Sequence, residues 1–249
     1  MLIELLKCQL QRAGRYKASV EINMVFILLA VYVNYSLYSL LEIGDYEQRR
    51  DIFFYTLLST SLSQTMATNR IPLFCKELRK GTIVRYYKYP MSFFRQFIYD
   101  EIGESVYSFI GISVFVVFTM FFKVQGLPQL GITIIMLILS GFMSILIAII
   151  VFSLSFLLMS EKCAKALLTC VSDLLSGTML PLVLLPKWFR SLCYYTPFPY
   201  LIDAPISILL GEEIQTNIVL MQLIWIVILY ITGKLVLNCT LKSVVVYGG

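Results

Sequence analysis

The sequence predicts an all-α polytopic membrane protein with six transmembrane helices. Of its 249 residues, 59% are hydrophobic and 14% are charged, whereas a soluble domain carries about 25% charged residues. The chain also holds several charge-free runs of about 20 residues, the length that a helix needs to cross a hydrocarbon core about 30 Å thick. These two features exclude a soluble globular fold.

Four charge-free runs meet this length, and two further segments complete the set. Residues 124–160 carry no charge and are too long for one straight span, so Pro128 predicts a turn before a long, tilted helix. The fifth span is interrupted by a single charge, Asp173. The expected spans cover residues 20–41, 52–70, 97–122, 130–159, 166–185 and 214–238.

The distribution of Lys and Arg predicts the orientation. The loops on one side hold fifteen of the 20 basic residues. Because cytoplasmic loops are enriched in Lys and Arg, both termini are expected in the cytoplasm and the chain in the cell membrane. The outer side holds only Arg49, Arg50, Lys123, Lys187 and Arg190.

Polar chemistry is sparse. Histidine is absent, which excludes a His general base, a His-led triad and a His-ligated metal site. The six cysteines form no C-x-x-C pair and are expected to be free thiols. By the topology only Cys193 faces outward, within reach of an external reagent. No catalytic, cofactor-binding or metal-ligating residue is predicted, which disfavours an intramembrane enzyme.

Two amphipathic segments lie outside the spans. In residues 1–17, apolar residues recur every three or four positions, which predicts an interfacial helix; a solvated helical leader is the alternative. Residues 76–90 are basic and amphipathic and lie between the second and third spans, which predicts a short helix on the cytoplasmic face. A partner protein could push against this helix, or anionic lipids could hold it.

Acidic residues near the membrane allow two interpretations each. Asp100, Glu101 and Glu104 open the third span, where they either sit among headgroups or line the mouth of a pathway. Asp173 lies about 12 Å beyond Lys165, close to the midplane. An unsatisfied charge there costs at least about 2.5 kcal/mol, so Asp173 is expected to make a structural hydrogen bond or to line a translocation route.

The outer segment 175–211 is as apolar as a span, but five prolines prevent one continuous helix. It predicts a re-entrant helix pair over residues 187–211 that dips into the outer leaflet and forms a gate. A greasy outer loop is the alternative. The residues expected at the headgroup level are Trp188, Tyr194, Tyr195 and Tyr200, with Lys187 and Arg190 reaching the headgroups.

Two motifs resemble those of permeases of the ABC type-2 transporter family. The pattern E-x-x-x-G-T at Glu77, Gly81 and Thr82, followed by Pro90, is similar to the cytoplasmic loop of these permeases. The outer segment is similar to their outer-side signature, with Ser176, Gly177, Pro181, Pro186, Trp188, Pro197, Phe198, Tyr200, Pro205 and Gly211.

The resemblance implies the membrane half of an ATP-driven exporter that works by alternating access. It implies a separate cytoplasmic ATPase that binds ATP and Mg, and a second permease, either an identical copy or a related chain. Residues 1–17 would be the elbow helix and 76–90 the coupling helix. The implied sites are ATPase coupling at Glu77, Arg79, Lys80, Gly81, Thr82 and Arg85; an outer gate at Pro186, Trp188, Pro197, Phe198, Tyr200 and Pro205; and pathway candidates Asp173 and Glu104.

The sequence agrees with a permease whose ATPase is a separate chain. The only Gly-Lys pair, Gly233–Lys234, has no phosphate loop before it, so this chain is expected to bind no cofactor itself. The apolar, aromatic pathway favours an amphipathic substrate such as a drug, a peptide antibiotic or a lipid-like molecule. Membrane lipids are expected partners and nucleic acid is not. An accessory or channel-type subunit without its own transport cycle remains the alternative function.

Overall fold

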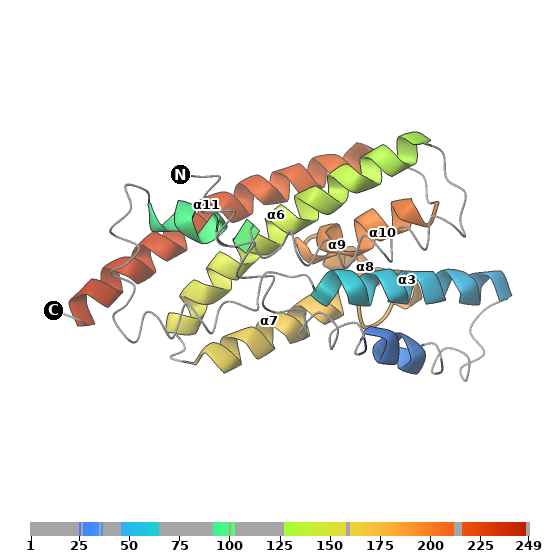
Figure 1. Ribbon diagram of the computed structural model, residues 1–249, viewed down its shortest axis with the longest axis horizontal. Helices are drawn as coiled ribbons and strands as arrows, with labels where there is room; N and C mark the ends of the chain where they lie inside the picture. Colours follow the sequence, from blue (N-terminus) through green and yellow to red (C-terminus); the bar gives the residue numbers. More distant parts are fainter. Residues whose placement is uncertain are drawn as a thin grey trace.

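The computed structural model describes residues 25, 27–34, 36, 46–64, 92–99, 101–102, 127–157, 160–211 and 216–247. Within these residues every regular element is a helix (Figure 1). Neither the elbow segment 1–17 nor the coupling segment 76–90 lies within the described residues. The first span, the third span and the cytoplasmic loops are described only in part or not at all, so the count of six spans stays a prediction.

Two long apolar helices form the spine of the molecule. These helices, α6 (Leu127–Leu157) and α11 (Thr216–Tyr247), lie side by side along the long axis (Figure 1). Both are long and apolar enough to cross a membrane, over 131–155 and 217–240. They are in contact at Gly233, where an added Cβ would meet the Leu146 backbone oxygen of α6 at an ordinary van der Waals distance of 3.7 Å.

The predicted turn at Pro128 does not precede α6, because the helix already begins at Leu127. Proline is tolerated in a first helical turn, where its missing N–H has no partner within the helix. The helix then continues without a break through the charge-free run.

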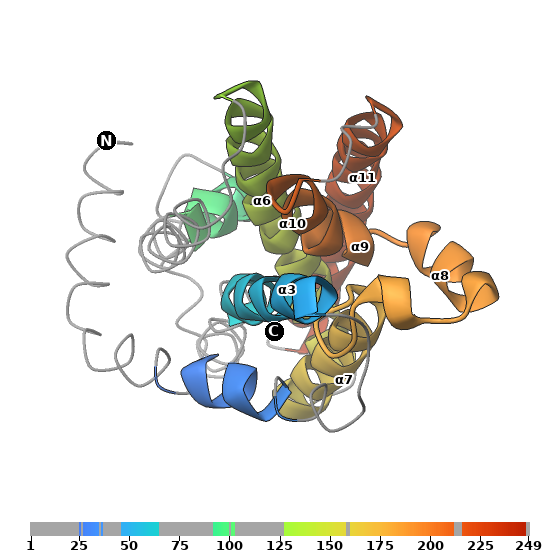
Figure 2. The same cartoon turned by 90° about the vertical axis from the view of Figure 1, so that its right-hand side faces the viewer.

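Two shorter helices lie beside this spine (Figures 1 and 2). The first, α3 (Tyr46–Gln64), begins inside the segment predicted to be an outer loop. The second, α7 (Glu161–Leu175), packs on α6 and starts at Ser160, whose hydroxyl accepts a hydrogen bond from the Cys163 N–H. Its 15 residues span about 22 Å, so the predicted span 166–185 is not one continuous helix.

Short helices connect α7 to α11, and we call them together the cap. They are η3 (Leu182–Leu184), α8 (Lys187–Tyr194), α9 (Phe198–Leu201) and α10 (Asp203–Leu209). A pair of helices was predicted over residues 187–211, whereas the structure has three α-helices there and a 3-10 turn before them. Prolines at the starts of η3, α8 and α9 account for the breaks. Figure 2 shows α8 standing out from the other described helices.

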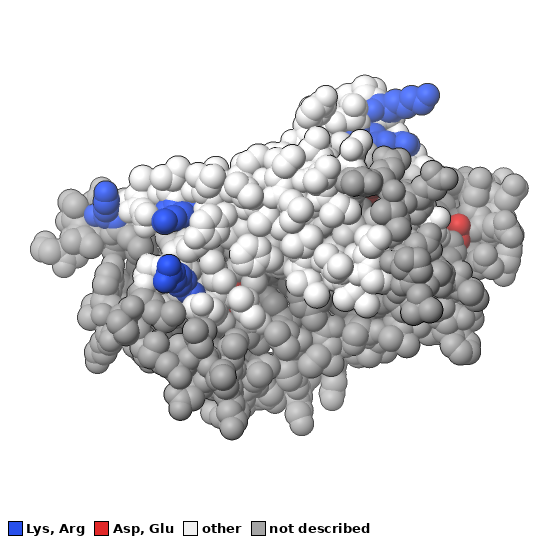
Figure 3. All heavy atoms as spheres, turned by 90° about the horizontal axis from the view of Figure 1, so that it is seen from above, with Lys and Arg blue, Asp and Glu red and all other residues white. Residues whose placement is uncertain are grey.

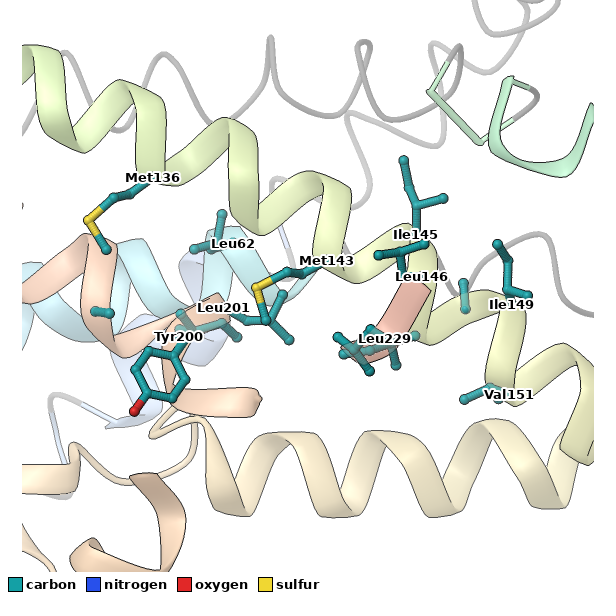
Figure 4. Close-up of a cluster of buried hydrophobic side chains, with 14 of the residues drawn as sticks. Leu62, Met136, Met143, Ile145, Leu146, Ile149, Val151, Tyr200, Leu201 and Leu229 are labelled. Carbon is teal, nitrogen blue, oxygen red and sulfur yellow. The ribbon is translucent and has the colours of Figure 1, made fainter. Parts of the chain in front are cut away.

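One hydrophobic cluster joins the cap to the long helices. Its buried members come from α3, α6, α7, α9, α10 and α11 and from adjoining segments. Ten of them are labelled in Figure 4, where the Tyr200 hydroxyl points away from the cluster. Phe93 and Phe97 reach the same cluster and contact the Phe152 ring of α6. The cap is thus part of the core and not a surface loop.

The charge distribution suits a membrane protein. On the face in Figure 3, Lys and Arg side chains gather toward the two ends of the long axis, and the described surface between them carries none. A hydrocarbon layer requires such a band, because Lys and Arg are costly at its centre.

Candidate functional site

The cap is fastened to α6 and α11 by the buried amide of Gln222 on α11. Its Nε2 lies 3.1 Å from the backbone oxygen of Met136, 3.1 Å from the hydroxyl of Ser140 and 3.1 Å from the backbone oxygen of Tyr200. Ser140 also donates to the Tyr200 oxygen, at 3.3 Å. One side chain thereby ties α9 to both long helices.

A second polar contact fastens the cap to α3. The Asp203 carboxylate, which is 5% exposed, accepts a hydrogen bond from the Tyr55 hydroxyl at 2.7 Å. Its other oxygen accepts from the Tyr194 hydroxyl of α8 at 3.1 Å. Hydrogen bonds to a charged group are among the stronger ones in proteins. Asp203 therefore joins α3, α8 and α10 at one point.

The turn after α7 is shaped around this contact. Gly177 has φ +84, in the left-handed region that glycine adopts freely. A Cβ at Gly177 would stand 2.5 Å from the Tyr55 hydroxyl oxygen. The preceding Ser176 is buried and its hydroxyl lies 2.8 Å from that of Thr178. Only glycine leaves room here for Tyr55 to reach Asp203.

Inside the cap, two side chains bond to backbone where the sequence predicted headgroup contacts. The Arg190 guanidinium donates from Nε to the Leu182 oxygen at 2.9 Å and from Nη2 to the Val183 oxygen, so it closes η3 onto α8. The Tyr200 hydroxyl donates to the Tyr194 oxygen at 3.0 Å. Burial raises the pKa of the Tyr200 phenol, which keeps this donor protonated.

The six predicted gate residues therefore divide into three groups. Tyr200 and Pro205 are buried, and Phe198 packs on the core cluster. Trp188 is 70% exposed on α8. The remaining two begin helices: Pro186 is the N-cap of α8 and Pro197 that of α9. Of the four aromatic residues predicted at the headgroup level, Trp188 and Tyr195 are the strongly exposed ones.

The prediction that an external reagent reaches Cys193 directly is wrong for this conformation. Its side chain is 0% exposed, on the inner side of α8. Burial, and then the charge of Asp203, raise the pKa of the Cys193 thiol. A thiol with a raised pKa holds less of the reactive thiolate at neutral pH. Cys193 is therefore shielded both by position and by chemistry.

Comparison with known families decides what kind of protein carries this cap. A family described as ABC-2 family transporter protein matches residues 21–248, nearly the whole chain. The chain belongs to the ABC-2 transporter family. The resemblance seen in the sequence is thereby confirmed. No curated protein matches the chain.

Membership makes this ABC-2 protein a membrane-embedded transporter component of the permease type, a class that works with an ATPase subunit and is not itself the ATPase. The predicted coupling residues Glu77, Arg79, Lys80, Gly81, Thr82 and Arg85 all lie outside the described residues. Within the described part of the chain, no group of three or more His, Cys, Asp or Glu is placed to hold a metal ion.

The pathway candidates of this ABC-2 protein are described unevenly. Asp173 lies half-buried near the end of α7, and its backbone oxygen accepts from the Met179 N–H at 3.2 Å. Glu104 lies outside the described residues. Its neighbour Glu101 is 2% exposed, so the Glu101 side chain is buried in protein.

Sequence reasoning missed the three residues that hold the cap: Tyr55, Asp203 and Gln222. Asp203 was missed because it lies within the proline-rich outer segment 175–211, where an acid is ordinary. Gln222 carries no charge and so did not interrupt its apolar run. The signal available was that a lone amide in a membrane helix is expected to face protein rather than lipid.

Proposed function

We propose that this chain is the permease subunit of an ATP-driven exporter that moves an amphipathic substrate by alternating access. The observation that carries the proposal is the ABC-2 family match over residues 21–248, joined to a sequence without G-x-x-x-x-G-K-[ST]. A permease without a phosphate loop needs its energy from another polypeptide. The partners proposed are a cytoplasmic ATPase that binds ATP and Mg, and a second permease.

The coupling segment is proposed from its charge and its position. Residues 76–90 hold five basic residues and one acid between the second and third predicted spans. Apolar side chains on the same short helix would anchor it in a groove of the ATPase, while the basic ones contact acidic groups there. A rigid helix seated in this way transmits the closing of the ATPase to the spans.

The cap is proposed as the outer gate. Its helices α9 and α10 pack against α6 and its loop ends are closed by Arg190 and Tyr200, which supports a closed conformation of this side. A closed cap over helices that cross the bilayer is what one end of an alternating-access cycle requires.

The substrate class is proposed from the buried hydroxyl side chains of α3. Thr56, Ser59, Thr60 and Ser61 are all buried, and their hydroxyls donate to backbone oxygens of their own helix. These hydroxyls can turn toward a guest molecule, because a local backbone bond is easily exchanged. Apolar surface with exchangeable hydroxyls suits an amphipathic molecule better than a bare ion.

A reconstitution experiment tests the proposal. The chain and its ATPase are placed in proteoliposomes, and ATP-driven transport of a fluorescent amphipathic dye is compared between wild type and the double variant Arg79→Glu/Arg85→Glu. Charge reversal in an interface of this kind is expected to reduce transport about tenfold or more. Lys242→Glu, an exposed basic residue at the far end of α11, is the matched control and should transport normally.

Three results would count against the proposal. Undiminished transport in the double variant would remove the coupling assignment. Dye movement that is independent of ATP would indicate a channel. ATP-driven transport by the second permease and the ATPase that is equally fast without this chain would indicate an accessory subunit.

A further inference from the structure

The cap is held on two sides by contacts of different character. On one side Gln222 and the hydrophobic cluster join α9 and α10 to α6 and α11. On the other side α10 packs on α3, which contributes three buried members to the same cluster against nine from α6, and whose Tyr55 hydroxyl donates to Asp203. An opening movement has to separate the cap from one of these two sides.

Separation on the Gln222 side would be costly. Leu201, Ile202 and Ile208 of the cap are each at most 2% exposed, and they belong to the same cluster as Met136 and Met143 of α6. Lifting the cap from α6 would bring this apolar surface into water, which is unfavourable in proportion to its area. The buried amide oxygen and the carbonyls around Gln222 lie within this apolar region.

Separation of α10 from α3 is less costly, because α3 contributes fewer buried apolar residues than α6 and because water can replace the hydrogen bond between Tyr55 and Asp203. A buried carboxylate has given up its hydration, and it regains that hydration when the site opens. The Tyr55 hydroxyl can likewise bond to water. The Tyr55 donor thus favours the closed cap, whereas the Tyr194 donor belongs to the cap and moves with Asp203. Hydration of the carboxylate makes the open cap tolerable.

We propose that the Tyr55–Asp203 hydrogen bond is the seam at which the outer side opens, and that the cap moves away from α3 while it stays attached to α6 and α11. Asp203 is a positioning residue in this proposal: it holds the gate closed and does not touch substrate. That this seam opens during transport rests on the proposed transport function, whereas the hydrogen bond itself can be tested without ATP.

Amide hydrogen exchange in the full-length chain, in lipid nanodiscs without ATP, tests the bond. Tyr55→Phe removes one hydroxyl and keeps the ring, and the amides of α10 are expected to exchange about tenfold faster. Tyr194→Phe removes a donor to the same carboxylate from within the cap, and Tyr195→Phe changes an 80% exposed ring. Both controls should leave exchange on the α3-facing side of α10 within about twofold of wild type.

Cys193 reports opening during transport. In a variant in which Cys193 is the only cysteine, reconstituted with its ATPase, a polyethylene-glycol maleimide should label the thiol several-fold faster when ATP is added, because the thiol is 0% exposed in the closed cap. Tyr55→Phe should label fast with or without ATP.

The outcomes separate the two proposals. Unchanged exchange in Tyr55→Phe, or equal acceleration in Tyr194→Phe, would overturn the seam. ATP-driven transport that leaves Cys193 shielded would overturn the seam and leave the exporter standing. No ATP-driven transport at all would overturn the exporter, while the exchange experiment would still decide the bond.

Discussion

Replacement of Gln222 gives the sharpest test of how the cap is anchored. Its Nε2 faces three oxygens at 3.1 Å, and the two backbone oxygens among them can only accept hydrogen bonds. Gln222→Leu removes the donors at similar volume. Gln222→Glu keeps the shape and places a carboxylate oxygen against the same acceptors.

The magnitudes follow from this geometry. An amide nitrogen carries two hydrogens, so Leu loses about two bonds, each worth about 1 kcal/mol in water or about 0.6 kcal/mol in a membrane protein. Each backbone oxygen keeps another donor, from its own helix or from Ser140, and no large cavity forms. Gln222→Leu should therefore cost about 1–2 kcal/mol. Glu faces oxygens in a site that is 0% exposed, so it should cost about 3–5 kcal/mol.

The assay is reversible unfolding of the full chain in mixed micelles, followed by far-UV circular dichroism. Asn217→Leu and Asn217→Asp are matched controls, because Asn217 is an exposed residue in the first turn of the same helix. Both should change the free energy of unfolding by less than about 0.5 kcal/mol. If Glu were no worse than Leu at position 222, the nitrogen would not be the atom facing the oxygens and the anchoring argument would fail.

Two further predictions concern the turn and the loop of the cap. Gly177→Ala should lower the free energy of unfolding by about 2–4 kcal/mol, since it adds a clash with Tyr55 to the strain of positive φ. The control Gly211→Ala is also at positive φ (+102) but has nothing within 4 Å, so it should cost about 1–2 kcal/mol. Equal costs of the two variants in denaturant unfolding would refute the role of the Tyr55 contact. Arg190→Gln should lower the free energy of unfolding by about 1–2 kcal/mol, because it loses two hydrogen bonds to backbone carbonyls. Lys187→Gln, on the exposed side of α8, should lower it by less than about 0.5 kcal/mol. Thermal unfolding of the two variants side by side checks this difference, and similar melting curves would contradict it.

The long helices could be predicted because their signal is local. A charge-free, largely apolar run over residues 130–159 or 214–233 specifies a helix in lipid whatever its neighbours are. The family could also be predicted, because its motifs depend on order and compartment along the chain. Both kinds of inference need only the residues themselves and their spacing.

The cap could be predicted only in outline, because its contacts depend on residues far away in the sequence. The prolines indicated that the outer segment is broken, but not where Tyr194 and Tyr200 point. An amphipathic ring suits the headgroup layer and a buried hydrogen bond equally well, and the positions of Asp203 and Cys193 decide between them. The same holds for Arg190, whose carbonyl partners belong to a 3-10 turn that no local pattern announced.

The separation of the cap's partners along the chain bears on biogenesis. Tyr55 precedes Asp203 by 148 positions and Met136 precedes Gln222 by 86. Because the ribosome works from the N-terminus, α3 and α6 exist well before the groups that will bind them. Outer closure is thus among the last steps of maturation, because the cap and Gln222 leave the ribosome long after α3 and α6.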